Sequence, residues 1–495
     1  MISSELQKAR EYEARNGPSI PPEQRPVFHL SPQCGWMNDP NGFGIYRGQY
    51  HMFYQYYPYA SHWDSMHWGH AVSGDMLHWE YLPCALAPDE AYDREGCFSG
   101  SAFPLPDGQQ LLMYTGVSRE QQENGQFQEL QTQNLAVGDG TDYRKYEGNP
   151  VLTAKDLPEG GSNADFRDPK IFQLSDGRLC CAIGNRPADG SGQILLYLSD
   201  DGFCWKFWKV LAANGNRFGR MWECPDFFPL DGKWVLITSP QDMLPEGFEY
   251  HNGNGTLCLT GNFDEQTGDF EEETDQAIDY GIDFYAPQTV LMPDGRRVMI
   301  GWMQNWDACA IRMPEAAWAG QMSLPRELSL RNGRLYQQPL RELASLRRDE
   351  AEFHDIPVCG QIRLPGVSGR AVEMEIRVRP ANPAALFHKF MVRFAENEQF
   401  HTAFSFRPHE GTLKADRKFS GSRRAIIHQR RCLVEHRDGV LTFRLILDRF
   451  SAECFIGDGE QVMSMSLYTE PSAEGISFYA DGEALMDLKF WRLGD

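Results

Sequence analysis

Long apolar runs are missing from this sequence. No segment approaches the roughly 18 apolar residues that a membrane span requires, and residues 1–19 lack the apolar core of a secretory signal. The twelve cysteines form no CxxC pair, and only Cys180 and Cys181 are adjacent. We therefore expect a cytoplasmic protein without a membrane anchor, whose thiols are reduced and mostly buried.

Basic side chains are also scarce relative to acidic ones. The chain has 47 Lys and Arg against 69 Asp and Glu, a net charge of −22. This balance argues against nucleic acid and against an anionic membrane surface as partners, because both need a basic footprint. The 495 residues are 41% hydrophobic and 12% aromatic, which is enough to build sizeable cores and excludes a disordered chain.

Helix signals are few. Residues 3–16 read as a short polar helix with a serine cap, and four prolines between 18 and 26 then favour an extended chain. We take residues 1–27 as a lead-in to the first domain. Nearly all of the remaining sequence has the short alternating runs of β-strands.

Five turn signals recur along the first part of the chain. Each is an Asp-Gly or Arg-Gly dipeptide between two strand-like runs, which favours a tight hairpin because the turn needs positive φ. The glycines lie 55–69 residues apart, a period that fits the four-stranded blades of a propeller. We predict a five-bladed β-propeller over residues 28–335. The five dipeptides are Arg47-Gly48, Asp107-Gly108, Asp176-Gly177, Asp231-Gly232 and Asp294-Gly295.

A second domain follows. Residues 336–356 are charged, with leucines at 340, 343 and 346, and are typical of a connector with a helical turn or two. Residues 357–495 contain alternating strands separated by turns, which predicts a β-sandwich. The expected fold is all-β, a five-bladed propeller followed by this sandwich.

Acidic residues recur near the predicted turns. Nine residues before the turn glycine lie Asp39, Asp168 and Glu223 in three of the units, and Ser99 and Ala286 in the other two. If each marks the same position on the innermost strand of its blade, the three carboxylates converge at one end of the propeller axis. Any one of them alone is equally typical of a turn or cap.

Clustered carboxylates repel one another and are costly to remove from water, so their clustering indicates use in catalysis. A pair of carboxyl groups is the machinery of glycoside hydrolysis, in which one ionised acid attacks the anomeric carbon and the other donates a proton. A third can hold sugar hydroxyls.

The motifs around these acids resemble those of glycoside hydrolase family 32, the family of invertases, sucrose-6-phosphate hydrolases and fructan hydrolases. The resemblance covers nearly the whole chain from residue 28, and the unexported form looks most like the sucrose-6-phosphate hydrolase branch. It implies a five-bladed propeller with a β-sandwich and a retaining β-fructofuranosidase activity. The matching segments are WMNDPNG (36–42), HMFYQYYPY (51–59), MHWGHAVSGDMLHWEYLPCALAP (66–88), FSGSA (98–102), FRDPK (166–170), WECPD (222–226), DFYAPQT (283–289), LPREL (324–328) and FIGDGE (455–460).

The resemblance also implies roles for individual residues. Asp39 would be the nucleophile, Glu223 the general acid and then base, and Asp168 the ligand of the fructose C3 and C4 hydroxyls. Further residues would shape the fructose pocket, with Trp68 a rival to Trp63. These are Trp36, Asn38, Gln55, Trp63, Phe98, Ser99, Arg167 and Tyr285.

No cofactor or metal is expected. His67 and His70 are three residues apart, as metal ligands on a helix can be, but their segment reads as strand and turn. Retaining hydrolysis of this kind needs no metal. The expected partner is a small sugar, and the sequence does not fix the oligomeric state.

Several alternatives remain open. A fructosyltransferase would share all three acids and differ only in letting a sugar replace water. An arabinosidase on a related five-bladed fold, or a non-catalytic sugar-binding propeller, is a further reading. Whether the substrate is sucrose, sucrose 6-phosphate or a short fructo-oligosaccharide is also undecided, since a phosphate would need a local basic patch. Lys170, Arg186 and Arg312 are basic residues near the predicted loops.

Overall fold

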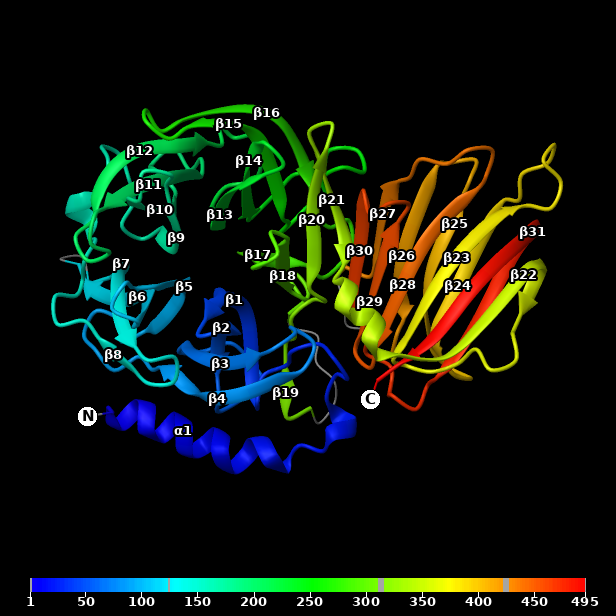
Figure 1. Cartoon of the computed structure of the whole chain (residues 1–495), viewed down its shortest axis with the longest axis horizontal. Helices are drawn as coiled ribbons and strands as arrows, with labels where there is room; N and C mark the ends of the chain where they lie inside the picture. Colours follow the sequence, from blue (N-terminus) through cyan, green and yellow to red (C-terminus); the bar gives the residue numbers. More distant parts are fainter. Residues whose placement is uncertain (1, 123–124, 310–315, 422–426, 495) are drawn as a thin grey trace.

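The chain forms two β-rich domains side by side, a ring of five sheets and a sandwich (Figure 1). The computed structural model describes residues 2–122, 125–309, 316–421 and 427–494. The five-bladed propeller and the sandwich predicted from the sequence are both confirmed.

The propeller blades are antiparallel sheets whose first strand lies nearest the central axis (Figure 1). In chain order the blades are β1 (Gly35–Tyr46), β2 (Gln49–Tyr57), β3 (His67–Ser73) and β4 (Trp79–Leu86); β5 (Gly96–Pro104), β6 (Gln110–Gln121), β7 (Phe127–Gly138) and β8 (Tyr143–Lys145); β9 (Phe166–Gln173), β10 (Leu179–Asn185), β11 (Gln193–Ser199) and β12 (Lys206–Ala213); β13 (Trp222–Leu230), β14 (Lys233–Pro240), β15 (Leu257–Asp264) and β16 (Asp269–Ala277); and β17 (Tyr285–Leu291), β18 (Arg297–Trp302), β20 (Arg326–Arg331) and β21 (Arg334–Pro339).

The five turn dipeptides each join the innermost strand of a blade to the second strand, as predicted. All five turn glycines have positive φ, between 81° and 93°. A side chain is disfavoured in that left-handed region, so glycine fits each of these turns.

A short fifth strand closes the ring. β19 (Trp318–Ala319) leaves the last blade between β18 and β20 and pairs in parallel with the start of β1 in the first blade. Gln288 of β17 adds a second link, since its side chain accepts from the Phe43 N–H and donates to the Gly100 carbonyl. The first and last blades are therefore held together by hydrogen bonds as well as by packing.

The N-terminal helix is confirmed as α1 (Ser4–Asn16), and the Ser3 side chain caps it by accepting from the Leu6 N–H. α1 lies along the outer strand β4 (Figure 1). Glu13 accepts from the Cys84 N–H at 2.7 Å, and Arg10 Nε donates to the Cys84 carbonyl at 2.9 Å. The helix therefore satisfies backbone groups at a sheet edge that would otherwise be open. Two short 3₁₀ helices, Gly17–Ser19 and Pro22–Gln24, interrupt the lead-in that we expected to be extended, and a third, Ala154–Asp156, lies in the propeller.

The sandwich is built around two long strands, β22 and β31. β31 pairs with β22 along its length, with β24 in its first half and with β23 in its second half, so both strands belong to both sheets. Apolar side chains of the two sheets form one core. The strands are β22 (Arg347–Ile362), β23 (Val372–Pro380), β24 (Lys389–Glu396), β25 (His401–Arg407), β26 (Thr412–Phe419), β27 (Gln429–Leu433), β28 (Leu441–Asp448), β29 (Ser451–Ile456), β30 (Gln461–Ser466) and β31 (Gly475–Leu493).

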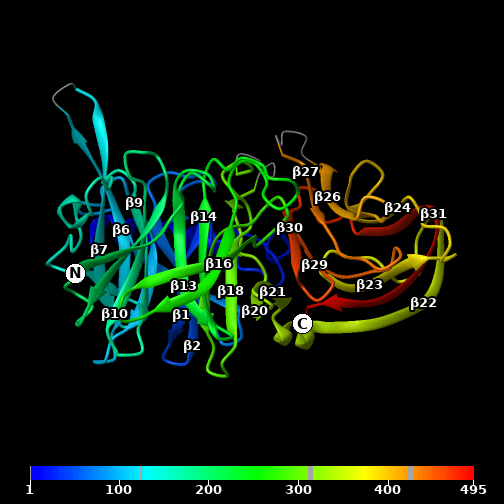
Figure 2. The same cartoon turned by 90° about the horizontal axis from the view of Figure 1, so that it is seen from above.

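The segment between the two domains is short. The expected connector, 336–356, contains the end of β21 and the start of β22, and only residues 340–346 lie outside the two sheets. Arg341–Leu346 form a 3₁₀ helix whose Leu343 and Leu346 are buried. The sandwich lies beside the propeller rather than over its axis (Figure 2). In the described parts of the chain, we find no helix long and apolar enough to cross a bilayer.

Candidate active site

Each innermost strand carries a β-bulge near its start. Pairing with the second strand is interrupted between Met37 and Pro40 in β1 and between Glu223 and Asp226 in β13, and the other three blades show the same break. A bulge re-aims side chains that would otherwise follow the pleat. The five bulges therefore form a ring at one end of the axis.

The prediction that the three acids share one strand position is wrong by one residue on either side of Asp168. Asp39 is the second bulge residue of its blade, Asp168 is the first, and Glu223 directly precedes the bulge. The turn glycine is not a constant reference point, because β1 has a second bulge between Asn41 and Gly44, and the β9–β10 hairpin has a longer loop than the two-residue turn of the β13–β14 hairpin. The carboxylates nevertheless lie around the same ring.

Three bulges place a non-glycine residue in the left-handed region. Asp168 has φ 67°, and the equivalent residues Cys224 and Ala286 have φ 49° and 51°. Such conformations cost energy and cluster at functional sites. In this ring they direct Asp168 and Cys224 toward Asp39.

Cys224 lies between two of the acids. Its Sγ is 3.5 Å from Asp39 Oδ2 and 3.5 Å from Asp168 Oδ2, and its backbone N–H donates to Asp168 Oδ2 at 2.9 Å. The thiol is buried, and the negative neighbours raise its pKa further above the ordinary value, so it is a neutral donor. The predicted convergence of Asp39 and Asp168 therefore takes the form of two carboxylates that both contact the Cys224 thiol.

Asp39 is almost fully buried, at 7% exposure. Ser99 Oγ donates to its Oδ2 at 3.0 Å. Burial raises the pKa of Asp39 to about 7, and the charges of Glu223 and Asp168 contribute. A carboxylate that is poorly hydrated and fixed in position suits a nucleophile.

Asp168 is anchored from the neighbouring blade, since its backbone N–H donates to Thr115 Oγ1 at 3.0 Å. Burial and the charge of Glu223 raise its pKa to about 6, against the lowering effect of Arg167. The two aspartates therefore titrate as members of one cluster near neutral pH.

Glu223 is held by three donors from three segments. Arg167 Nε donates to Oε1 at 2.9 Å, Gln241 Nε2 to Oε2 at 2.8 Å, and the Tyr285 hydroxyl lies 2.7 Å from Oε2. The Tyr285 hydroxyl also lies 2.9 Å from the Ser239 carbonyl. Since a hydroxyl has one proton, it can donate to the carbonyl and accept from a protonated Glu223, or turn and donate to the carboxylate. The site accommodates both protonation states of Glu223.

Aromatic side chains line one side of the cluster. Trp36 Nε1 donates to Asn38 Oδ1 at 2.8 Å, and its ring packs with Tyr285 and Cys224. The rings of Phe98 and Trp63 meet edge to face at 6.0 Å, and Trp63 is 44% exposed. The Phe98 and Trp63 rings offer apolar faces on which the C–H face of a sugar can stack, whereas Trp36 is only 1% exposed.

Trp68 occupies a different place. It is fully buried within the first two blades, and its Nε1 donates to the Phe98 carbonyl. Gln55 is also buried and donates to the Cys97 carbonyl at 3.0 Å. Trp63 therefore remains the pocket candidate, while Trp68 and Gln55 support the strand that carries Phe98 and Ser99.

The candidate phosphate-binding residues are already paired. Lys170 is buried and lies 3.2 Å from Asp226. Arg186 contacts Asp165 through two nitrogens, at 2.6 and 2.9 Å. Arg312 lies outside the described residues.

The histidines do not form a metal centre within the described chain, where we find no group of three potential ligands. His70 lies 3.0 Å from His51 and stacks on Phe53. His67 contacts the Ser65 carbonyl instead. An odd spacing on a strand sends the two side chains to opposite faces.

Sequence reasoning missed Gln241, Gln131 and Asp165. Gln131 and Asp165 both contact Arg167, which in turn holds Glu223. All three lie outside the acid motifs, on neighbouring strands and loops, where no repeat marks them. An arginine beside a candidate catalytic acid is the available signal, since a buried guanidinium needs further acceptors.

A ring of bulges that gathers buried carboxylates on a five-bladed propeller defines a glycoside hydrolase site. Residues 29–339 match the family model for the glycosyl hydrolases family 32 N-terminal domain, and residues 342–492 match the model for its C terminal.

Relatives match over almost the full length. Raffinose invertase of Escherichia coli is 38% identical, over 94% of this chain and 95% of the relative. Sucrose-6-phosphate hydrolase of the same organism is 36% identical, over 95% of each. The structure of a Bombyx mori GH32 β-fructofuranosidase variant in complex with sucrose superposes with a TM-score of 0.84 at 34% identity, covering 100% of this chain and 99% of that one. The chain belongs to glycosyl hydrolase family 32.

Proposed function

We propose that this chain hydrolyses terminal β-fructofuranosides with retention, using Asp39 as nucleophile and Glu223 as acid and base. The observation that carries the proposal is the geometry of the two side chains. Asp39 is fixed by Ser99 and lacks exposure to water, while Glu223 is held by Arg167, Gln241 and a tyrosine that tolerates either protonation state.

In the first step Asp39 attacks the anomeric C2 of fructose, and the C2–O bond to the leaving sugar breaks. Glu223 gives its proton to the departing oxygen, which leaves a fructosyl ester on Asp39. The transition state carries positive charge on the fructose ring, which the surrounding carboxylates stabilise. In this proposal Asp168 accepts hydrogen bonds from fructose hydroxyls.

In the second step the ionised Glu223 takes a proton from water, and the water oxygen attacks C2. The bond from C2 to Asp39 breaks and fructose leaves with its configuration retained. Tyr285 supports this change of role, because its hydroxyl can donate to the carboxylate once the proton has gone.

For the substrate we propose neutral fructosides such as sucrose and short fructo-oligosaccharides, in preference to sucrose 6-phosphate. Arg167, Arg186 and Lys170 are compensated by carboxylates, so they offer little unpaired charge to a phosphate. The net charge of −22 also disfavours the approach of an anion.

The test is kcat/KM for sucrose, sucrose 6-phosphate and 1-kestose under one set of conditions. Equal or better use of the neutral sugars supports the proposal. A preference of more than about tenfold for the phosphorylated sugar overturns the substrate assignment. For the mechanism, Asp39→Ala and Glu223→Ala should each lose turnover while folding normally.

Analysis of the reaction products distinguishes hydrolysis of fructosides from two other activities. Transfer would show as oligosaccharides that grow with sucrose concentration, whereas hydrolysis releases equal fructose and glucose. Release of arabinose from an arabinofuranoside, without release of fructose from any fructoside, would move the assignment to the arabinosidases.

A further inference from the structure

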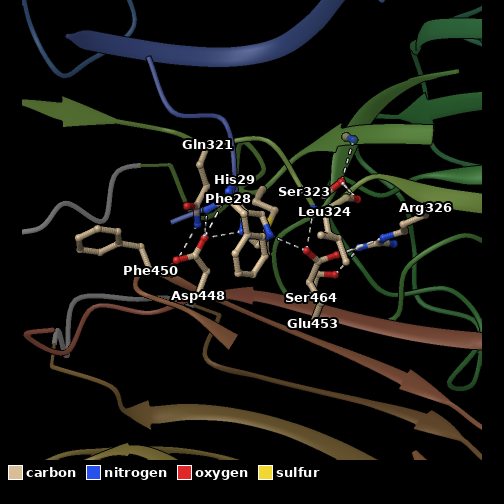
Figure 3. A network of polar contacts seen from close by, with 12 residues as sticks. Phe28, His29, Gln321, Ser323, Leu324, Arg326, Asp448, Phe450, Glu453 and Ser464 are labelled. Atoms are coloured by element: carbon tan, nitrogen blue, oxygen red, sulfur yellow. Dashed lines mark hydrogen bonds and ion pairs between the residues drawn. The ribbon is translucent and has the colours of Figure 1, made fainter. Parts of the chain in front are cut away.

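One hairpin of the sandwich reaches the segments that flank the catalytic strand β1. The hairpin joins β28 to β29 and carries Asp448, Phe450 and Glu453. It contacts residues 27–29, directly before β1, and residues 318–326, which include β19 (Figure 3). Asp448 and Glu453 are fully buried.

Asp448 fixes the approach to β1 through its backbone. The carboxylate accepts the N–H groups of three consecutive residues, Val27 at 2.8 Å, Phe28 at 3.1 Å and His29 at 3.2 Å. Three successive donors on one carboxylate leave the chain little freedom in direction. They fix the chain as far as His29, six residues before β1 begins at Gly35.

His29 ties the two carboxylates together. Its Nδ1 lies 2.9 Å from Asp448 and its Nε2 lies 2.9 Å from Glu453. Because each ring nitrogen faces a carboxylate oxygen, both nitrogens donate and the ring is a cation. Glu453 also accepts from Arg326 Nη2 at 2.6 Å, and Arg326 pairs with Asp279 at 3.0 Å (Figure 3).

The same hairpin holds the second flanking segment. Glu453 accepts the Leu324 N–H at 2.8 Å, and the Phe450 carbonyl accepts from Gln321 Nε2 at 3.0 Å. The Phe450 ring packs edge to face on Trp318 at 5.3 Å. Trp318 is the β19 residue that pairs with Gly35 of β1.

Both paths meet at the start of β1. Gly35 and Trp36 pair with β19, and Trp36 donates to Asn38, the neighbour of Asp39. The carbonyl of Met37 lies so close to Gly320 that a Cβ there would sit 1.9 Å from it. The contact leaves little room for β1 to shift without β19.

We propose that the β28–β29 hairpin positions the nucleophile, so that Asp448, Glu453 and Phe450 of the sandwich are positioning residues for Asp39. This inference rests on the nucleophile role proposed for Asp39. The sandwich then belongs to the catalytic apparatus through contact with the strand and without touching substrate.

The character of the contact favours positioning over simple docking. Buried ion pairs contribute little net stability, because desolvation offsets their attraction, but they restrict geometry. The sandwich is also held to the propeller outside this network, because Arg417 of the sandwich pairs with Asp283 of the propeller. Asp448 and Glu453 nevertheless accept the backbone N–H groups of four residues in the two flanking segments, Val27, Phe28, His29 and Leu324.

The test compares Asp448→Ala with Asp448→Asn. The alanine variant leaves all three backbone N–H donors without their carboxylate acceptor, and we expect kcat for sucrose to fall about 10–100-fold, as a misplaced nucleophile implies, with KM changed less than about threefold. The asparagine variant keeps one oxygen acceptor and should retain more of kcat.

Glu373→Gln is the matched control. Glu373 is fully buried within the sandwich and pairs with Arg347 and Arg444, away from β1. It should lower the melting temperature and leave kcat unchanged. Should Asp448→Ala fail to fold, Phe450→Leu provides the second variant, because it keeps every charge and removes the ring contact with Trp318.

Wild-type kcat in a folded Asp448→Ala or Phe450→Leu protein overturns the inference, and so does an equal loss of kcat in Glu373→Gln. Failure of this inference and failure of the proposed function can be told apart. Turnover by Asp39→Ala would overturn the nucleophile assignment, whereas an inactive Asp39→Ala with a fully active Asp448→Ala would overturn only the role of the hairpin.

Discussion

The Cys224 thiol has one proton to donate and lies between two carboxylates that could each accept it. Its thiol is 3.5 Å from both Asp39 and Asp168, yet an S–H group donates only once. When both aspartates are ionised, one of these contacts is not a hydrogen bond. The site therefore holds negative charge that is incompletely compensated, and folding opposes the ionisation of the two aspartates.

Asp39→Asn should stabilise the protein at neutral and alkaline pH. Because the fold raises the pKa of Asp39 from 3.8 to about 7, its ionised form costs stability above pH 7, and this cost disappears as pH falls toward 4. We expect a melting temperature a few degrees higher at pH 8, with no turnover, and little change at pH 4. Thermal melts of both proteins at the two pH values provide the measurement; an equal gain at both would contradict the charge origin.

Tyr285→Phe should lower kcat by roughly 10–100-fold, which corresponds to the loss of one hydrogen bond to a charged group, about 1.5–3 kcal/mol. Steady-state kinetics on sucrose measure it. Tyr114→Phe is a suitable control, because the Tyr114 hydroxyl also donates to a buried carboxylate, Asp93, at 2.7 Å, away from the acids. A similar loss of kcat in both variants would indicate a general packing effect.

Individual residues were predictable where a motif carries them. Asp39, Asp168 and Glu223 could be found because each lies nine residues before the turn glycine of its blade. Gln241 and His29 were not predicted, since their roles come from loops of different blades or domains meeting in space. No periodic pattern marks such contacts.

At the scale of elements, the bulge is the feature that turns five similar blades into a site. Each blade offers the same break in pairing, and different residues fill it. The hairpin turns that define the blades were predictable because their chemistry is local. The register around the bulges was not, because it depends on the loop length of each hairpin and on further bulges such as the one between Asn41 and Gly44 of β1, and β19 is too short to leave a pattern.

Gly320→Ala should separate β19 from β1. Gly320 has φ +88°, and an added Cβ would meet the Met37 carbonyl at 1.9 Å. We expect a loss of stability on the order of 1–3 kcal/mol or more, together with reduced kcat. Chemical denaturation and sucrose kinetics measure the two effects.

Gly295→Ala controls for backbone strain in that experiment. Gly295 has φ +87°, and nothing lies within 4 Å of its added Cβ. It should cost some stability and leave kcat unchanged. If both alanine variants behave alike, the contact between β19 and β1 has no special role.

At the scale of the whole molecule, two domains share a buried set of charges. The carboxylates of Asp448 and Glu453 raise the pKa of His29 from 6.5 to about 9, against burial, which lowers it. Arg326 and Asp279 are the other charged groups paired within this network. The contact between the two domains therefore depends on the proton that keeps His29 positively charged.

The stability of the two-domain protein should fall at alkaline pH. A cation whose pKa is raised on folding stabilises fully below pH 6.5, and the stabilisation is lost as pH rises through about 9. We expect the melting temperature to drop between pH 7 and pH 10, and His29→Gln to be less stable at pH 7 but flatter over this range. Parallel slopes for the two proteins would show that another group controls the transition.

The place of β31 has a consequence for synthesis. It ends at Leu493, and both sheets of the sandwich pair with it. Chains emerge from the ribosome N-terminus first and domains fold in that order. All five blades are synthesised by Pro339, yet the sandwich cannot assemble its centre until β31 has emerged from the ribosome. A nascent chain thus has a complete propeller before it has the hairpin that braces the strand carrying Asp39, and activity should appear only once β31 is available for pairing.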